Sequence, residues 1–172
     1  EMDGESAIEV MNREASRGGP LSGACWVDGK LYLRCSGGRD AVESRCSDMN
    51  GEQLPDSADF WNSIREQAHP FFTADEPLWR LSAKSCADLP VEGSWLIDWG
   101  GAQRWLKSGT DLPEHEALAG KMGGQVTLWR GGDRSAEFFH ARTDAQKQIH
   151  LALKQAFDPD RVFNPGRLYS WL

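Results

Sequence analysis

Residues 93–108 read Gly-Ser-Trp-Leu-Ile-Asp-Trp-Gly-Gly-Ala-Gln-Arg-Trp-Leu-Lys-Ser, and they place two runs of aromatic and aliphatic residues on either side of a glycine pair. Gly100 and Gly101 both tolerate positive φ, which suits a two-residue hairpin turn. Both faces of the predicted hairpin carry large apolar side chains. Because a strand with two apolar faces is normally covered on both sides, we predict that this hairpin lies at the centre of a sheet.

The turn position also predicts which residues of the hairpin face each other. Successive side chains of a strand alternate between the two faces, so opposite residues share a face. One face should carry the pairs Trp99–Ala102, Ile97–Arg104 and Trp95–Leu106, and the other should carry Leu96–Trp105 and Asp98–Gln103. Arg104 would then lie diagonally between Trp95 and Trp99, a setting that favours a stacked guanidinium.

The composition restricts the class of protein. The chain has 172 residues, of which 40% are hydrophobic, with eight tryptophans and a formal net charge of −7. This length suits one domain with a substantial core. The basic residues form no run, which argues against a nucleic-acid partner, and no apolar run approaches the roughly 20 residues of a membrane span. Neither the four cysteines nor the four histidines have ligand spacing, which favours free thiols in a reducing, cytoplasmic compartment over a disulfide or a metal site.

The remaining patterns alternate between helices and strands. A helix capped by Asp3 precedes a hairpin of residues 22–27 and 30–36 around Asp28-Gly29. Further predicted elements are a helix carrying Val42, Cys46 and Met49, a helix over 57–68, a strand over 78–84, a helix that starts at Pro113, a strand over 126–129 and a helix opened by a capping box at Thr143. This order predicts an α+β fold, in which an antiparallel sheet carries helices mainly on one face as in a ferredoxin-like sandwich. We expect one domain over residues 1–172, whose tail begins at residue 158.

The sequence lacks the common catalytic signatures, such as a dinucleotide-binding G-x-G-x-x-G, a phosphate loop or a G-x-S-x-G. The glycine pairs are interpreted as turns, and the tryptophans as core packing or as a stacking platform. Arginines within apolar strands are the better candidates, namely Arg34, Arg80 and Arg104. A guanidinium is costly to bury, so each requires a partner. That partner is either a structural carboxylate, such as Asp98 or Glu92, or the carboxylate of a substrate.

The tail adds a family resemblance. Residues 153–169, Leu-Lys-Gln-Ala-Phe-Asp-Pro-Asp-Arg-Val-Phe-Asn-Pro-Gly-Arg-Leu-Tyr, resemble the C-terminal signature of FAD-linked oxidases of the vanillyl-alcohol-oxidase type. Other stretches are similar to the FAD-binding subunit of bacterial glycolate oxidases, namely 20–23, 60–61, 65–67, 70–72, 78–82, 96–107 and 123–124. The resemblance therefore extends over nearly the whole chain.

The resemblance implies a function. It implies oxidation of glycolate to glyoxylate with FAD as hydride acceptor, in a complex with a second flavoprotein and an iron–sulfur subunit, and peripheral membrane association through that complex. The chain would be the cap domain that covers the flavin, without the N-terminal FAD-binding domain, and on its own it would bind no FAD. Arg80 and Arg104 are then the candidate substrate-binding residues.

The tail predicts a docking surface. Pro165-Gly166 fits a type II turn, which would display Asn164 and Arg167 toward the FAD-binding domain while Phe157 and Phe163 anchor the turn in the core. Two other hypotheses stay open at this point. The chain could be an interaction domain that docks partner subunits without substrate contact, or a free-standing sensor of a small ligand.

Overall fold

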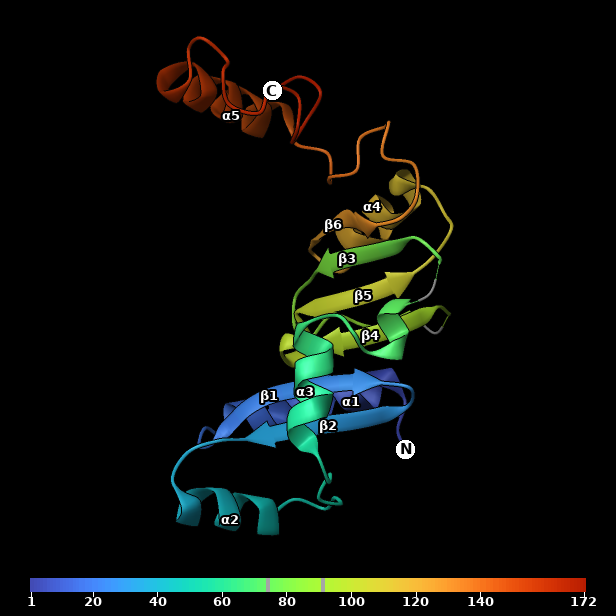
Figure 1. Ribbon diagram of the computed structural model, residues 1–172, viewed down its shortest axis with the longest axis vertical. Coiled ribbons are helices and arrows are strands. Elements are labelled where there is room, and N and C mark those ends of the chain that lie inside the picture. Colours follow the sequence, from blue (N-terminus) through green and yellow to red (C-terminus); the bar gives the residue numbers. More distant parts are fainter. Residues whose placement is uncertain (74, 91) are drawn as a thin grey trace.

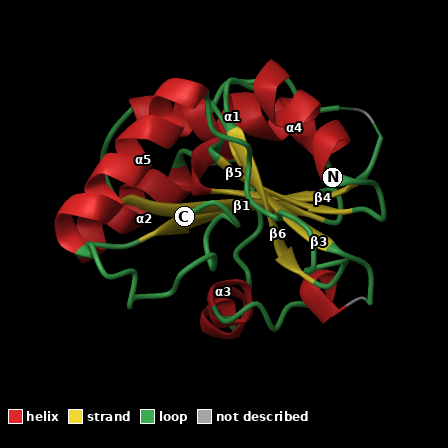
Figure 2. Cartoon of the chain, turned by 90° about the horizontal axis from the view of Figure 1, so that it is seen from above, coloured by secondary structure: helices red, strands yellow, loops and turns green. Residues whose placement is uncertain are grey.

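A computed structural model describes residues 1–73, 75–90 and 92–172 of the chain. These residues form a six-stranded antiparallel sheet in the order β2-β1-β4-β5-β3-β6, with helices packed against it (Figures 1 and 2). The strands are β1 (Leu21–Val27), β2 (Lys30–Cys35), β3 (Leu78–Ser82), β4 (Ser94–Asp98), β5 (Gln103–Lys107) and β6 (Gln125–Arg130). The predicted α+β class is confirmed, and the β4–β5 hairpin occupies the two central positions of the sheet.

The register of the central hairpin is the predicted one, but its turn is not. Trp95 pairs with Leu106, Ile97 with Arg104, and Asp98 with Gln103, so side-chain alternation was read correctly. Four residues rather than two connect the strands, including a short 3-10 turn, η2 (Trp99–Gly101). Trp99 itself adopts a left-handed φ of 50° and is 69% exposed. The predicted Trp99–Ala102 pair is therefore wrong.

Gly101 explains why the hairpin end has this form. It adopts a φ of 94°, and a Cβ at this position would overlap the carbonyl oxygen of Ser85. Only glycine permits both this conformation and this approach of the backbone. The close contact fixes the η2 turn against the chain that follows β3.

The β1–β2 hairpin agrees with the prediction. Asp28 and Gly29 form its two-residue turn, with φ of 51° and 74°. The two faces separate as alternation requires. Ala24 lies in the cluster on one side of the sheet, together with Ile97 and Leu106, and Cys25 lies in the cluster on the other side, together with Leu96 and Trp105.

Helices cover both faces of the sheet, rather than mainly one face as predicted. The first face is covered by α1 (Gly4–Ser16), which is capped by Asp3 as predicted, and by α4 (Leu112–Lys121), whose Ala119 is buried in the core. The opposite face is covered by α3 (Ser57–Arg65) and by a 3-10 turn, η1 (Pro70–Thr73), whose Phe71 and Phe72 are buried (Figure 2). The end of the central hairpin therefore lies between α1, on one face of the sheet, and α3, on the other.

Two helices form where predicted but bury little. They are α2 (Arg39–Ser47) and α5 (Asp144–Phe157), and α5 carries the predicted capping box between Thr143 and Gln146. Neither has a buried residue. α5 stands away from the sheet, at the far end of the molecule from α2 (Figure 1).

The predicted anchoring of Phe157 and Phe163 in the core is wrong, since these side chains are 83% and 68% exposed. The segment between β6 and α5 leads the helix away from the sheet, and its apolar stripe has no covering element among the described residues. None of the helices in the described ranges combines the length and the hydropathy that a membrane crossing requires.

Candidate functional site

Arg80 occupies the exposed end of a polar row on the α3 side of the sheet. Its Nε donates to Gln103 Oε1 at 2.8 Å, across the β3–β5 ladder. Its guanidinium carbon lies 5.9 Å from the ring centroid of Trp99 and 5.4 Å from that of Trp129. The two terminal amino groups of Arg80 have no hydrogen-bond or ion-pair partner among the residues that the structure describes. Arg80 is thus a half-buried cation that the amide of Gln103 and two indole rings hold in place. Its two terminal amino groups are available to donate hydrogen bonds to a ligand.

Asp98 occupies the buried end of the same row. Gln103 links it to Arg80, because Gln103 Nε2 donates to Asp98 Oδ2 at 3.3 Å. Asp98 is only 8% exposed, and burial raises its pKa to about 6 against the lowering influence of Gln103, Trp105 and Arg80. The carboxyl group therefore changes charge near neutral pH rather than near its ordinary value of 3.8.

Two polar atoms in this row lack a hydrogen-bond partner. They are Asp98 Oδ1 and Trp105 Nε1, and both are shielded from solvent. Buried polar groups are nearly always paired, and an unpaired one is destabilising. Trp105 nevertheless lies close enough to Asp98 to lower the pKa of that carboxyl group, so the two groups face each other within the buried end of the row and are not open to a ligand.

A cleft of about 610 Å³ opens beside this row, at the end of the central hairpin. Asp98, Gln103 and Trp105 line it, together with Trp99. On the opposite wall the guanidinium of Arg34 lies 5.2 Å from the ring centroid of Trp61, and both of these residues also line the cleft. Arg80 does not line the cleft, but it contacts two residues that do, Gln103 and Trp99. We name this site the hairpin-end cleft. Its aromatic walls and the guanidinium group of Arg34 suit a small anionic or planar ligand.

Arg104 lies on the opposite face of the hairpin and is wholly buried. Its guanidinium donates to three backbone carbonyls, to Gly101 O and Asp88 O at 2.9 Å each and to Ala87 O. Burial lowers its pKa, and the nearby Asp88 and Cys86 oppose that change. The predicted stacking of Arg104 between Trp95 and Trp99 is wrong, because Trp99 leaves the strand and turns toward Arg80. The proposed contact of Arg104 with a substrate stays a prediction, which its burial and its bonds to three backbone carbonyls disfavour.

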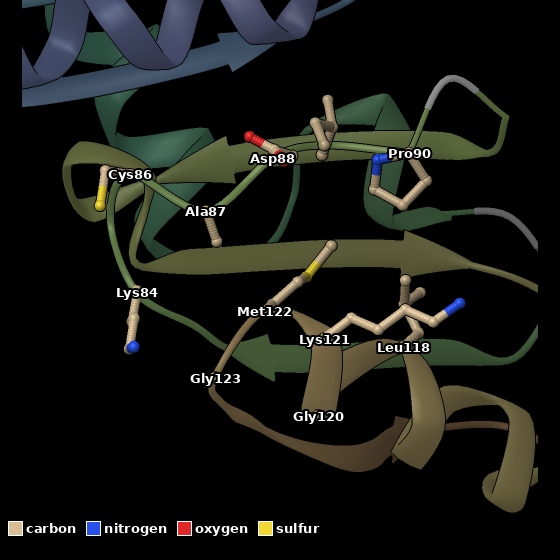
Figure 3. Close-up of a pocket in the computed structure, with 11 residues that line it drawn as sticks. Lys84, Cys86, Ala87, Asp88, Pro90, Leu118, Gly120, Lys121, Met122 and Gly123 are labelled. Atoms are coloured by element: carbon tan, nitrogen blue, oxygen red, sulfur yellow. The ribbon is translucent and has the colours of Figure 1, made fainter.

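Arg104 supports a second cavity of about 600 Å³, between the chain after β3 and the end of α4 (Figure 3). Figure 3 shows the lysines Lys84 and Lys121 and the thiol of Cys86 around it. The side-chain polar atoms found buried and unpaired in the described parts of the chain do not include any from its lining. We therefore regard the hairpin-end cleft as the stronger candidate.

Asn164 and Arg167 lie far from both cavities, in the tail. Both are exposed, and Arg167 N donates to Asn164 O at 3.2 Å across the Pro165-Gly166 turn. Gly166 has a φ of 68°, as a type II turn requires. The turn is therefore formed as predicted, whereas the docking role of these two side chains stays a prediction.

The tail is attached both to α5 and, through Tyr169 and Ser170, to the segment that follows β6. Asp158 accepts hydrogen bonds from the backbone N–H groups of Val162 at 2.9 Å and Phe163 at 3.1 Å. Lys154 holds both sides of this loop, through an ion pair with Asp158 at 2.5 Å and a bond to Phe163 O at 2.6 Å. These contacts lower the pKa of Asp158. The loop therefore presents Val162 and Phe163 to solvent on a fixed support.

Comparison with known proteins gives a relative. The chain is 40% identical over 156 residues to glycolate oxidase subunit GlcE of Escherichia coli (strain K12). The chain is a relative of GlcE. The match covers 89% of this chain but 43% of GlcE, so the chain spans less than half the length of that relative. No protein-family model matches the chain, and no solved structure matches it. The resemblance to the glycolate oxidase subunit inferred from the sequence is confirmed.

In this relative of GlcE, the sequence identified Arg80 but missed the residues that orient it. Gln103 and Asp98 were predicted as a pair, and that pairing was the available signal for a polar row. The contribution of Trp99 was missed because the predicted turn placed it on the other face. Trp129 offered no sequence signal, since its contact with Arg80 depends on the β3–β6 pairing.

Proposed function

We propose that this chain is the cap region of an FAD-linked subunit that takes part in the oxidation of a small 2-hydroxy acid, with glycolate giving glyoxylate. The observation that carries the proposal is the 40% identity to GlcE over 89% of the chain. The geometry near the hairpin-end cleft supports it, since Arg80 has unpaired donors and contacts Gln103 and Trp99, two residues that line this cleft.

In this proposal Arg80 binds the carboxylate of the acid. A guanidinium can give two parallel N–H···O bonds to a carboxylate, and its two terminal amino groups are the ones left unpaired. Gln103 and the rings of Trp99 and Trp129 hold the guanidinium in place before the acid binds. The tryptophans would also exclude water from the bound acid.

FAD would accept the hydride from the carbon atom that bears the hydroxyl group. Three glycine pairs of this chain form turns: Gly100-Gly101 closes the central hairpin, Gly123-Gly124 follows α4 and Gly131-Gly132 follows β6. We therefore propose that the remainder of the protein holds FAD, and that this chain covers it.

The tail suggests where the chain meets that remainder. Asn164 and Arg167 are exposed on a defined turn, and Phe157, Val162 and Phe163 are exposed beside it. We propose that this surface docks onto the FAD-binding part, and that the subunit assembles with a second flavoprotein and an iron–sulfur subunit, through which it associates with a membrane. The same exposed surface also favours a second candidate function, an interaction domain without substrate contact.

Replacing Arg80 in the complete protein separates these two functions. Arg80→Lys keeps the charge but loses the planar pair of donors, so we expect KM for glycolate to rise at least about tenfold. The melting temperature and the assembly with partner subunits should stay unchanged. A purified complete enzyme that oxidises glycolate equally well with Lys at this position would favour the interaction domain instead.

A further inference from the structure

Two cysteines from different elements lie at one edge of the sheet. Cys35 is the last residue of the edge strand β2, and Cys46 belongs to the last turn of α2, which lies beyond that edge (Figure 1). Strand alternation directs the side chain of Cys35 to the same face as Leu31 and Leu33. Those two leucines pack against the core cluster that α1 covers. The thiol of Cys35 is therefore on the α1 face of the sheet.

An ion pair brings the last turn of α2 to this face. Arg45, the residue before Cys46, donates to Glu14 Oε2 at 2.5 Å and to Glu14 O at 3.5 Å. Glu14 is a buried residue near the end of α1, and the side chains of Arg45 and Glu14 are only 12% and 6% exposed. A shielded, charge-assisted pair is stronger than an ion pair on the surface. It holds α2 in place although α2 buries no residue of its own.

The two thiols meet beside this ion pair. Burial raises the pKa of the Cys35 thiol, and Cys46 raises it further through its charge and through a hydrogen bond between the two side chains. Arg45 lowers the same pKa and Glu14 raises it, so all four groups belong to one cluster. Both cysteines are free thiols, Cys35 half buried and Cys46 exposed. Two sulfur atoms in contact need little movement of the chain to become bonded.

We propose that Cys35 and Cys46 form a reversible redox site, which hydrogen peroxide converts to a disulfide and a dithiol reductant restores. The bond fixes the end of α2 to the edge of the sheet. In the reduced protein α2 is held without buried residues, so it opens locally at low cost. The disulfide closes the loop between residues 35 and 46 and removes most of that freedom.

The exposed thiol is the one that peroxide reaches first. The thiolate of Cys46 attacks a peroxide oxygen, an S–O bond forms as the O–O bond breaks, and the released hydroxide takes a proton to become water. The sulfur of Cys35 then attacks the sulfenic acid on Cys46, and a second water leaves as the S–S bond forms. Together the two thiols lose two electrons and two protons, and one peroxide molecule becomes two water molecules.

The experiment maps the bond in the purified chain after treatment with hydrogen peroxide. Free thiols are alkylated without reduction, the chain is digested with trypsin, and the peptides are analysed by mass spectrometry. We expect the peptide of residues 35–39 to be joined to that of residues 46–65, because arginines precede and end both peptides. Dithiothreitol should separate the two peptides.

Limited proteolysis of the folded chain gives a second readout. Trypsin cleavage after Arg39 and Arg45 requires α2 to open, so oxidation should slow it at least about tenfold. Cys35→Ser and Cys46→Ser should each abolish both the joined peptide and this protection. The matched control is Cys86→Ser, which removes an exposed thiol from the cavity after β3 and should change neither result. Because Cys46 is exposed, its variant remains informative if Cys35→Ser unfolds.

Three results would overturn the proposal. One is oxidation of Cys46 to sulfenic or sulfinic acid without a bond to Cys35. Another is a joined peptide that includes Cys86, or one that comes from dimers on a non-reducing gel, which would indicate random or intermolecular coupling. The third is a disulfide between Cys35 and Cys46 that leaves the rate of cleavage within α2 unchanged.

Discussion

The two arginines of the sheet interior lie on opposite faces of neighbouring strands, and their surroundings differ completely. Arg104 is buried, and each of its three guanidinium nitrogens donates to a backbone carbonyl. Arg80 is half buried, and its terminal donors are unpaired beside two indole rings. A saturated guanidinium ties chain segments together, whereas an unsaturated and oriented one is available to a ligand. The structure thus gives different surroundings to two residues that the sequence pattern treats alike.

Replacing each of the two arginines by Met should give the largest difference in the free energy of unfolding. Arg104→Met leaves three buried carbonyls without a donor, so we expect the free energy of unfolding to fall by about 4 kcal/mol. Arg80→Met should cost about 1 kcal/mol, because its terminal donors bond to nothing in the fold. Urea unfolding of both variants measures the difference. Similar losses for the two would contradict the assignment of Arg104 to structure and Arg80 to binding.

The charge of Asp98 should have the next largest effect on the free energy of unfolding, through its dependence on pH. Its folded-state pKa of about 6 lies above its ordinary value of 3.8, so the folded protein holds this proton more tightly than the unfolded chain. Stability from this group is therefore complete below about pH 4 and is lost as the pH rises through about 6. Asp98→Asn removes this dependence. Between pH 4 and pH 7 the parent should lose about 2.5 kcal/mol relative to the variant.

Unfolding free energies of parent and variant at both pH values provide the measurement. The comparison between pH values cancels any constant cost of the amide. A difference between parent and variant that stays the same at pH 4 and pH 7 would show that Asp98 titrates normally.

The exposed face of α5 should give the smallest effect on stability. Ile149, Leu153 and Phe157 are exposed, so replacing Leu153 and Phe157 by Ser should change the unfolding free energy of the sheet by less than about 0.5 kcal/mol. The same double variant should weaken assembly of the complete protein, as measured by size-exclusion chromatography. The matched control is Leu96→Ser, in the core, which should unfold the chain. Normal assembly of the double variant would remove the docking role of α5.

Much of the fold followed from alternation and turn chemistry. The central register, the Asp28-Gly29 turn and the capping box at Thr143 depend on local patterns, and all three are present. The conformation of Trp99 could not be read from the sequence, because a large aromatic residue rarely adopts a left-handed φ. Trp99 was expected beside Arg104, but because of this conformation it lies beside Arg80 instead.

The α5 helix illustrates a second limit. Its amphipathic pattern predicted an apolar stripe correctly but could not say what covers it, and the sheet does not. The same holds for the candidate site, where Arg80 was found from its place in an apolar strand. Gln103, Trp99 and Trp129 act on Arg80 only through pairing between distant strands.

An NMR titration of the isotope-labelled chain with glycolate tests most directly whether a ligand binds on the face of Arg80 and not on that of Arg104. The indole N–H signals of the tryptophans report on each face. We expect the signals of Trp99 and Trp105, in the hairpin-end cleft, and of Trp129, beside Arg80, to shift with saturation. Trp79 and Trp95, whose indole nitrogens bond to Ser108 O and Glu92 O, should not move. Shifts confined to Trp79 and Trp95, or none at any of the five, would contradict binding on the Arg80 face.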